Sequence, residues 1–119
     1  MKSYKDLIVW QKSIELVIVI YRLTSKFPKS ELFNMVVQMN KAAISIPSCI
    51  AEGFGRRSKK EKEEFYLVSY GSAMELENQI FIAKKLGFIE ESDCVKVDEL
   101  LNEILRMLNK LTSSSRANY

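Results

Sequence analysis

Apolar side chains recur at alternating spacings of three and four residues along nearly the whole chain, and this period limits the fold more than any other feature. Such spacing places side chains on one face of an α-helix, whereas a half-buried strand alternates every second residue. The pattern predicts four helices, at about residues 6–26, 32–54, 58–86 and 92–112, joined by short connections. We therefore predict an all-α protein, an antiparallel up-down-up-down four-helix bundle over residues 1–112.

The same spacing predicts which side chains face the core of the bundle. In the first two helices they are Leu7, Trp10, Ile14, Val17, Tyr21 and Thr24, then Leu32, Val36, Met39, Ala43, Ile46 and Ile50. In the last two they are Phe65, Val68, Ser72, Leu76, Gln79, Ala83 and Leu86, then Cys94, Val97, Leu101, Ile104, Leu108 and Leu111. The first helix carries further apolar residues outside this face, so we expect it to pack on two sides or against another subunit.

The second predicted helix contains a proline. Pro47 lacks the N–H that would bond the carbonyl four residues earlier, and its ring crowds that carbonyl. Because the apolar spacing continues beyond it, we predict a second helix kinked at Pro47 rather than one that ends there. Gly53 and Gly55 are expected to end this helix in the left-handed capping conformation. The sequence SKKE, residues 58–61, predicts a capping box at the start of the third helix.

The composition excludes several kinds of enzyme. The chain has no histidine, so a Ser-His-Asp triad, a Cys-His pair and a histidine metal ligand cannot be built. An acid/base pair drawn from Glu52, Glu75 and Glu77 is conceivable, but carboxylates paired with Lys or Arg of a neighbouring helix explain these residues more simply. We predict no catalytic residue, no metal and no cofactor.

The two cysteines and the hydropathy bear on location. Cys49 and Cys94 are expected to be small core residues of a reduced intracellular protein, with a disulfide or a redox role as the alternative. The longest apolar run, Leu16 to Tyr21, is far shorter than the roughly 20 residues of a membrane span. We predict a cytoplasmic protein without membrane contact, and a disordered C-terminal tail at residues 113–119.

Positive charge is concentrated in the first half of the chain. Residues 1–62 contain 12 Lys and Arg against 5 Asp and Glu, whereas residues 63–119 contain 6 against 10. Five cations fall within seven residues: Arg56, Arg57, Lys59, Lys60 and Lys62. They surround the positive end of the third helix, so a phosphate bound there would be stabilised. A solvated charged turn and a site for an acidic protein surface are the alternatives.

Four stretches of the sequence resemble a known family. They are LIVWQKSIEL (7–16), YRLTSKFPKSELF (21–33), QMNKAAISIPSCIAEGFGRRSKKEKEEF (38–65) and GSAMELENQIFIAKKLGFI (71–89). Together they resemble the four-helix-bundle family that includes proteins encoded by intervening sequences in bacterial 23S ribosomal RNA genes. The accessory protein of diversity-generating retroelements is a relative. Cys49 stands where the family pattern usually has asparagine.

The resemblance covers about residues 4–112. It implies a homopentameric barrel of bundles with a basic surface and, in the retroelement relative, binding to nucleic acid and to the reverse transcriptase.

We therefore expect a non-enzymatic homo-oligomer that binds nucleic acid, with structured RNA as the expected partner and little dependence on sequence. The predicted phosphate contacts are Arg56, Arg57, Lys59, Lys60 and Lys62, with Lys12 and Lys41 as weaker candidates. In this hypothesis the bend at Pro47 places the cluster at one rim of the assembly. The alternative is a scaffold that binds a protein, such as an accessory subunit of a polymerase or reverse transcriptase.

Overall fold

The computed structural model describes residues 2–112, which form four α-helices and no strand. The helices are α1 (Ile8–Thr24), α2 (Met35–Phe54), α3 (Lys59–Lys85) and α4 (Val95–Leu111). Short 3-10 turns precede three of them: η1 (Tyr4–Asp6), η2 (Lys29–Glu31) and η3 (Glu91–Cys94). The predicted all-α, four-helix fold is confirmed, and the predicted tail at residues 113–119 lies outside the described residues.

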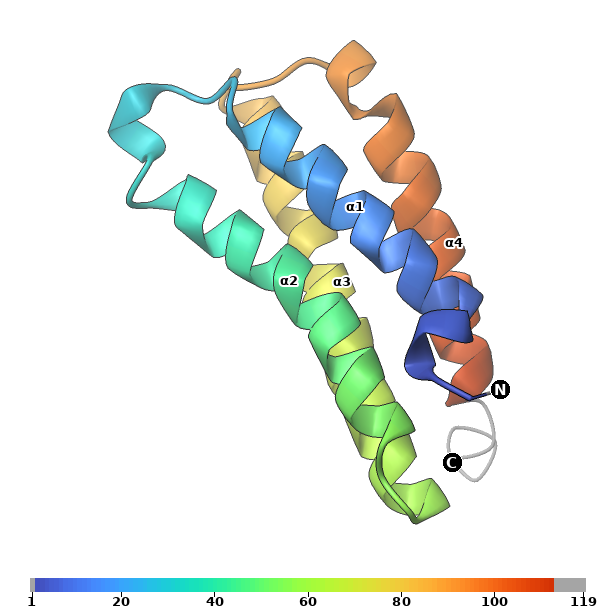
Figure 1. Ribbon diagram of the computed structural model, residues 1–119. Coiled ribbons are helices and arrows are strands. Elements are labelled where there is room, and N and C mark those ends of the chain that lie inside the picture. The colour runs from blue at the N-terminus through green and yellow to red at the C-terminus, as the bar shows by residue number, and fades with distance from the viewer. Residues whose placement is uncertain (1, 113–119) are drawn as a thin grey trace.

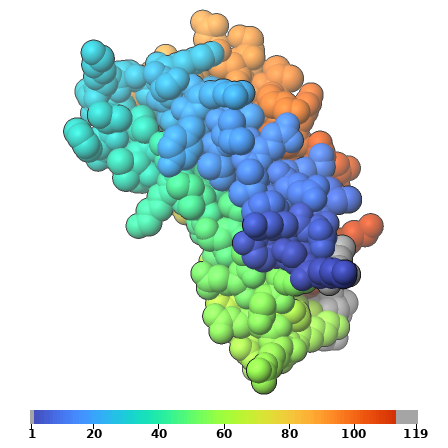
Figure 2. All heavy atoms as spheres, in the orientation of Figure 1, coloured from blue at the N-terminus to red at the C-terminus, as the bar shows by residue number. Residues whose placement is uncertain are grey.

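Successive helices run in opposite directions in Figure 1, where the chain rises along α1, descends along α2, rises along α3 and descends along α4. Helices α1 and α3 each pack against both α2 and α4. The contact between α2 and α3 is the most extensive, and this helical hairpin reaches beyond the ends of α1 and α4 (Figures 1 and 2). One end of the molecule is therefore formed by the α2–α3 hairpin alone.

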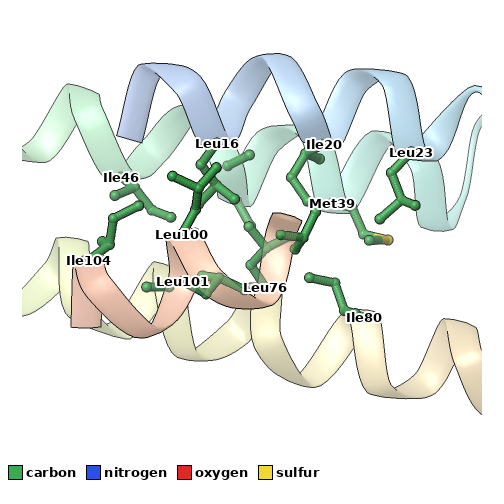
Figure 3. Packing of buried hydrophobic residues seen from close by; sticks show 14 of the residues in the cluster. Leu16, Ile20, Leu23, Met39, Ile46, Leu76, Ile80, Leu100, Leu101 and Ile104 are labelled. Atoms are coloured by element: carbon green, nitrogen blue, oxygen red, sulfur yellow. The ribbon is translucent and has the colours of Figure 1, made fainter. Parts of the chain in front are cut away.

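The core is formed by aliphatic side chains from all four helices, which point toward one another in Figure 3. Its most deeply buried members include Leu16, Ile20, Met39, Ile46, Leu76, Ile80, Leu100, Leu101 and Ile104. Burying one such side chain contributes about 1.5–3 kcal/mol before the entropy of ordering it is subtracted. This cluster holds the helices together and leaves the α2–α3 end to be stabilised by local contacts.

The predicted core-facing positions are mostly confirmed in α2 and α4. In α2 the buried ones are Val36, Met39, Ala43, Ile46 and Ile50, whereas Leu32 precedes the helix and is exposed. At the fourth helix they are Cys94, which precedes α4, and Val97, Leu101, Ile104 and Leu108 within it, whereas Leu111 is partly exposed. Apolar and polar residues are well separated around α4, whereas α2 also exposes Val37 (50%) and Ile44 (43%), so in α2 the regular spacing identifies the buried face.

The predicted positions are wrong by one residue in α1 and in the first half of α3. Helix α1 buries Val9, Ser13, Leu16, Ile20 and Leu23, and of its predicted positions only Thr24 is buried. Helix α3 buries Tyr66, Ser69 and Ala73 in place of Phe65, Val68 and Ser72. Two of these buried positions are serines, Ser13 and Ser69, and their hydroxyl groups have hydrogen-bond partners. The Ser13 hydroxyl donates to the Trp10 carbonyl (2.8 Å) and the Ser69 hydroxyl to the Ile46 carbonyl of α2 (2.9 Å). A serine bonded in this way can be buried at little cost.

Helix α2 continues through Pro47 to Phe54, so the prediction that the proline does not end the helix is confirmed, while the bend stays a prediction. The left-handed cap expected at Gly55 is wrong, because its φ is −78° and the Arg56 N–H bonds the Gly53 carbonyl (3.1 Å) in a right-handed turn. Among residues 2–112 a positive φ occurs only at Gly87, just after α3. The chain thus passes from α2 to α3 without any residue in the left-handed conformation.

Candidate nucleic-acid interface

The basic cluster lies at the projecting end of the α2–α3 hairpin, where residues 55–58 join the two helices (Figure 1). Ser58 caps α3 by accepting the backbone N–H of Glu61 (3.1 Å), which confirms the first half of the predicted capping box, whereas the Glu61 carboxylate does not bond the Ser58 backbone N–H. The Ser58 hydroxyl also donates to the Glu61 carboxylate (3.0 Å), so the carboxylate is held by the side chain. This connection fixes the positions of the cations on either side of it.

Gly53 allows α2 and α3 to approach closely just before this connection. A Cβ atom at Gly53 would lie 2.8 Å from the Tyr66 ring and 3.0 Å from Cβ of Phe65. Real Cβ contacts are longer than this, so a larger residue would push the helices apart. The glycine therefore sets how near the end of α2 lies to the first turns of α3.

Arg56 is stacked on an aromatic ring. Its guanidinium carbon lies 4.6 Å from the centroid of the Phe65 ring, and its side chain remains 45% exposed. The nearest carboxylate is that of Glu52, at 4.0 Å, which is the outer limit of an ion pair. Arg56 thus has its guanidinium group over the Phe65 ring and only a weak acidic partner.

Lys62 binds the protein itself. Its ammonium donates to the backbone carbonyl of Phe54 at the end of α2 (2.7 Å) and lies 5.4 Å from the centroid of the Phe54 ring. A cation at this position satisfies a carbonyl at the negative end of the helix. Lys62 therefore braces the hairpin and is a poor candidate for a phosphate contact.

The remaining three cations of the cluster, Arg57, Lys59 and Lys60, are exposed. Within residues 2–112 none of them has a carboxylate within ion-pair distance. The surrounding sequence holds five cations and four carboxylates over residues 52–64, a net charge of only +1. Glu63, one of these carboxylates, is buried. The net charge of this segment therefore does not decide whether it attracts an anion. The attraction depends on which charged side chains are exposed and have no partner.

Lys12 and Lys41 lie apart from this cluster. Lys12 of α1 forms an ion pair with Glu103 of α4, and its hydrogen bond lowers the pKa of the Glu103 carboxyl. Lys41 is exposed on α2 and lines a shallow hollow with apolar residues of α1 and α2. It stands about 20 Å along the helix from the hairpin end. The structure therefore brings together five of the seven predicted contact residues.

Some of the excess cations in the first half of the chain form ion pairs with carboxylates of the second half. The ion pairs Lys12–Glu103 and Lys26–Asp93 (2.8 Å) join cations of the first half of the chain to carboxylates of the second. The opposite net charges of the two halves thus contribute to packing, and these ion pairs leave fewer cations for a partner. Sequence reasoning did not find the Arg56–Phe65 stack, although an aromatic residue one or two helical turns after a basic turn is a usable signal.

The described residues include no group of three or more side chains placed to hold a metal ion, and none of their helices is long and apolar enough to cross a membrane. Both cysteines are free, Cys94 buried and Cys49 half-buried beside Ser45 (3.7 Å).

The family model described as 23S rRNA-intervening sequence protein matches residues 5–110. This is nearly the whole described chain, so the protein belongs to this family. No protein with a curated description matches the chain.

Proposed function

We propose that this member of the 23S rRNA-intervening sequence protein family is a non-enzymatic, cytoplasmic RNA-binding protein whose α2–α3 end contacts phosphates. The observation that carries the proposal is the exposure of Arg57, Lys59 and Lys60 on a projecting hairpin, without a carboxylate partner among the described residues. The family description refers to sequences within 23S rRNA, and this favours RNA over other polyanions.

Three or four phosphate contacts give weak binding by one chain. Each contact releases condensed counterions, so the logarithm of the affinity falls with the logarithm of salt by about 0.7–0.9 per contact. A slope of about −2 to −3 for each chain is expected if Arg57, Lys59 and Lys60 all take part. Useful affinity then requires several copies acting together on one RNA.

Self-association is the second element of the proposal. Large apolar side chains on α1 and α2 are exposed beside one another, including Tyr21 (48%), Val37 (50%) and Ile44 (43%). Lys41 lies among them, and exposed carboxylates at Glu75 and Glu77 on α3 provide charges of the opposite sign. Contact between these surfaces of neighbouring copies would bury both, and a homopentamer is the assembly that the family resemblance implies.

A protein-binding scaffold is the second candidate function. The same apolar surface on α1 and α2 could receive a partner such as a polymerase or reverse transcriptase. In that case the cations of the α2–α3 end would face an acidic protein surface. Binding of RNA by the isolated protein separates the two candidates.

Titration of fluorescent structured RNA, duplex DNA and heparin at two salt concentrations tests the RNA proposal. Replacing Arg57, Lys59 and Lys60 together by serine should weaken RNA binding at least about tenfold and remove about 2–3 from the salt slope. The matched control replaces Arg22, Lys29 and Lys85, which are exposed at the opposite end of the bundle. Equal losses in both triple variants, or no binding by the native protein, would refute the proposal.

Light scattering of the native protein measures its assembly. A mass near the 13.8 kDa of one chain would refute self-association.

A further inference from the structure

We infer that Arg56 and Phe65 form a platform on which an unpaired RNA base stacks. The inference rests on the proposed RNA binding and specifies which part of an RNA the α2–α3 end receives. The guanidinium carbon of Arg56 lies over the Phe65 ring, 4.6 Å from its centroid, so a planar cation and an aromatic ring adjoin at the hairpin surface. The ligand is a single-stranded segment such as a loop, bulge or end.

The guanidinium group of Arg56 is available to a ligand. Phe65 contacts one side of this group, while the arginine side chain is 45% exposed. Its ion pair with Glu52 is long, at 4.0 Å, and joins two exposed side chains (45% and 58%), so displacing it costs little. A guanidinium is planar and weakly hydrated, and it stacks on aromatic groups, including bases.

The neighbouring cations fit the backbone of the same segment. Arg57 follows Arg56 directly, and Lys59 and Lys60 begin α3 within one turn of the connection. A base on Arg56 therefore places its adjoining phosphates beside exposed cations. A site for phosphate alone would need only positive charge. The planar guanidinium of Arg56, held over the Phe65 ring, is suited to stacking with a base.

The second cation–ring pair at this end provides a comparison. Lys62 lies 5.4 Å from the Phe54 ring centroid, but its ammonium donates to the Phe54 carbonyl. An ammonium is compact and has no flat surface for a base. Only the Arg56–Phe65 pair among these two offers a planar cation to a ligand.

Duplex RNA cannot use this platform. Its bases are stacked on one another inside the helix, and only phosphates, 2′-hydroxyl groups and base edges are presented. The platform therefore predicts a preference for unpaired RNA that charge alone would not produce. A charge-preserving substitution at Arg56 separates these two contributions.

The test compares the full chain and two variants by fluorescence anisotropy on a uridine oligonucleotide and on a duplex RNA with the same number of phosphates. Arg56→Lys keeps the positive charge and removes the planar guanidinium, and Arg22→Lys, at an exposed position at the opposite end of the bundle, is the matched control. We expect Arg56→Lys to weaken binding of the uridine oligonucleotide about tenfold, with duplex binding changed less than about twofold. Arg22→Lys should leave both affinities unchanged within about twofold, because it lies outside the proposed site.

A second variant, Phe65→Leu, keeps an apolar side chain and removes the ring. It should reproduce the selective loss on unpaired RNA, with the helical circular dichroism spectrum unchanged. Equal effects of Arg56→Lys on the two RNAs, or none, would overturn the platform while leaving RNA binding intact. Failure of the native protein to bind either RNA at low salt would overturn the proposed function, and the platform with it.

Discussion

Replacing Gly53 by alanine tests the close contact between α2 and α3 that positions the candidate site. In an open helix this change stabilises by about 1 kcal/mol, because alanine has the higher helix propensity. Here the added Cβ would lie 2.8 Å from Cε1 and 3.1 Å from Cδ1 of Tyr66, and 3.0 Å from Cβ of Phe65. Overpacking of this kind costs about 1–3 kcal/mol, so the net loss of unfolding free energy is expected to be up to about 2 kcal/mol.

Gly71→Ala provides the matched control, because Gly71 lies within α3 and a Cβ there would meet nothing within 4 Å. We expect this variant to gain about 1 kcal/mol. Urea unfolding of both variants at one protein concentration measures the difference, which should appear as several degrees in thermal unfolding. If Gly53→Ala gained as much stability as Gly71→Ala, the close approach of the two helices would be refuted.

The Gly53→Ala variant also links packing to binding. The added atom would displace Phe65 as well as Tyr66, and Phe65 supports the guanidinium of Arg56. The variant should therefore bind unpaired RNA more weakly although it removes no charge. Unchanged binding would mean that the position of Phe65 does not matter to the ligand.

Three further predictions concern stability and reactivity. Lys62→Met should lower the unfolding free energy by about 1 kcal/mol, because a backbone carbonyl loses its donor, whereas Arg57→Met should leave it nearly unchanged in urea unfolding. The hydrogen bond from Lys26 lowers the pKa of Asp93, so its stabilisation is lost as the pH falls through that lowered pKa. Between about pH 5 and pH 2, thermal unfolding should consequently shift less for Asp93→Asn than for the native protein. Burial raises the pKa of the Cys94 thiol, so it should resist a thiol reagent at about pH 8 until urea unfolds the chain.

The number, order and approximate ends of the helices could be predicted from the sequence because the apolar period is long and the connections are short. The buried face was identified in α2 by its regular spacing and in α4, where polar residues occupy the opposite side. It was missed in α1, because this helix is apolar on several sides and its buried face includes Ser13. Hydrophobicity alone could not choose between adjacent faces, because the Ser13 hydroxyl donates to the Trp10 carbonyl of its own helix and this polar side chain can be buried.

In the first half of α3 the predicted buried positions were wrong by one residue for a related reason. Ser69 and Ala73 are buried, while the more apolar Val68 is 55% exposed. Small residues allow α2 and α3 to approach, and the Ser69 hydroxyl finds the Ile46 carbonyl. Such a contact depends on the position of the second helix, which a single-helix pattern does not contain. The exposure of Val68 in turn agrees with the proposed burial of apolar surface between copies.

The five clustered cations look equivalent in the sequence, and the fold gives them three different roles. Lys62 turns back to the end of α2, Arg56 lies on Phe65, and the other three remain in solvent. These differences arise because a short connection brings the first turns of α3 beside the last turn of α2. The run of charge therefore indicates where an anion binds. The Phe54 carbonyl binds Lys62 and the Phe65 ring contacts Arg56, so the other three cations are left for the anion. A charge count alone would assign five phosphate contacts, whereas this geometry predicts three phosphate contacts, one stacking surface and one structural brace.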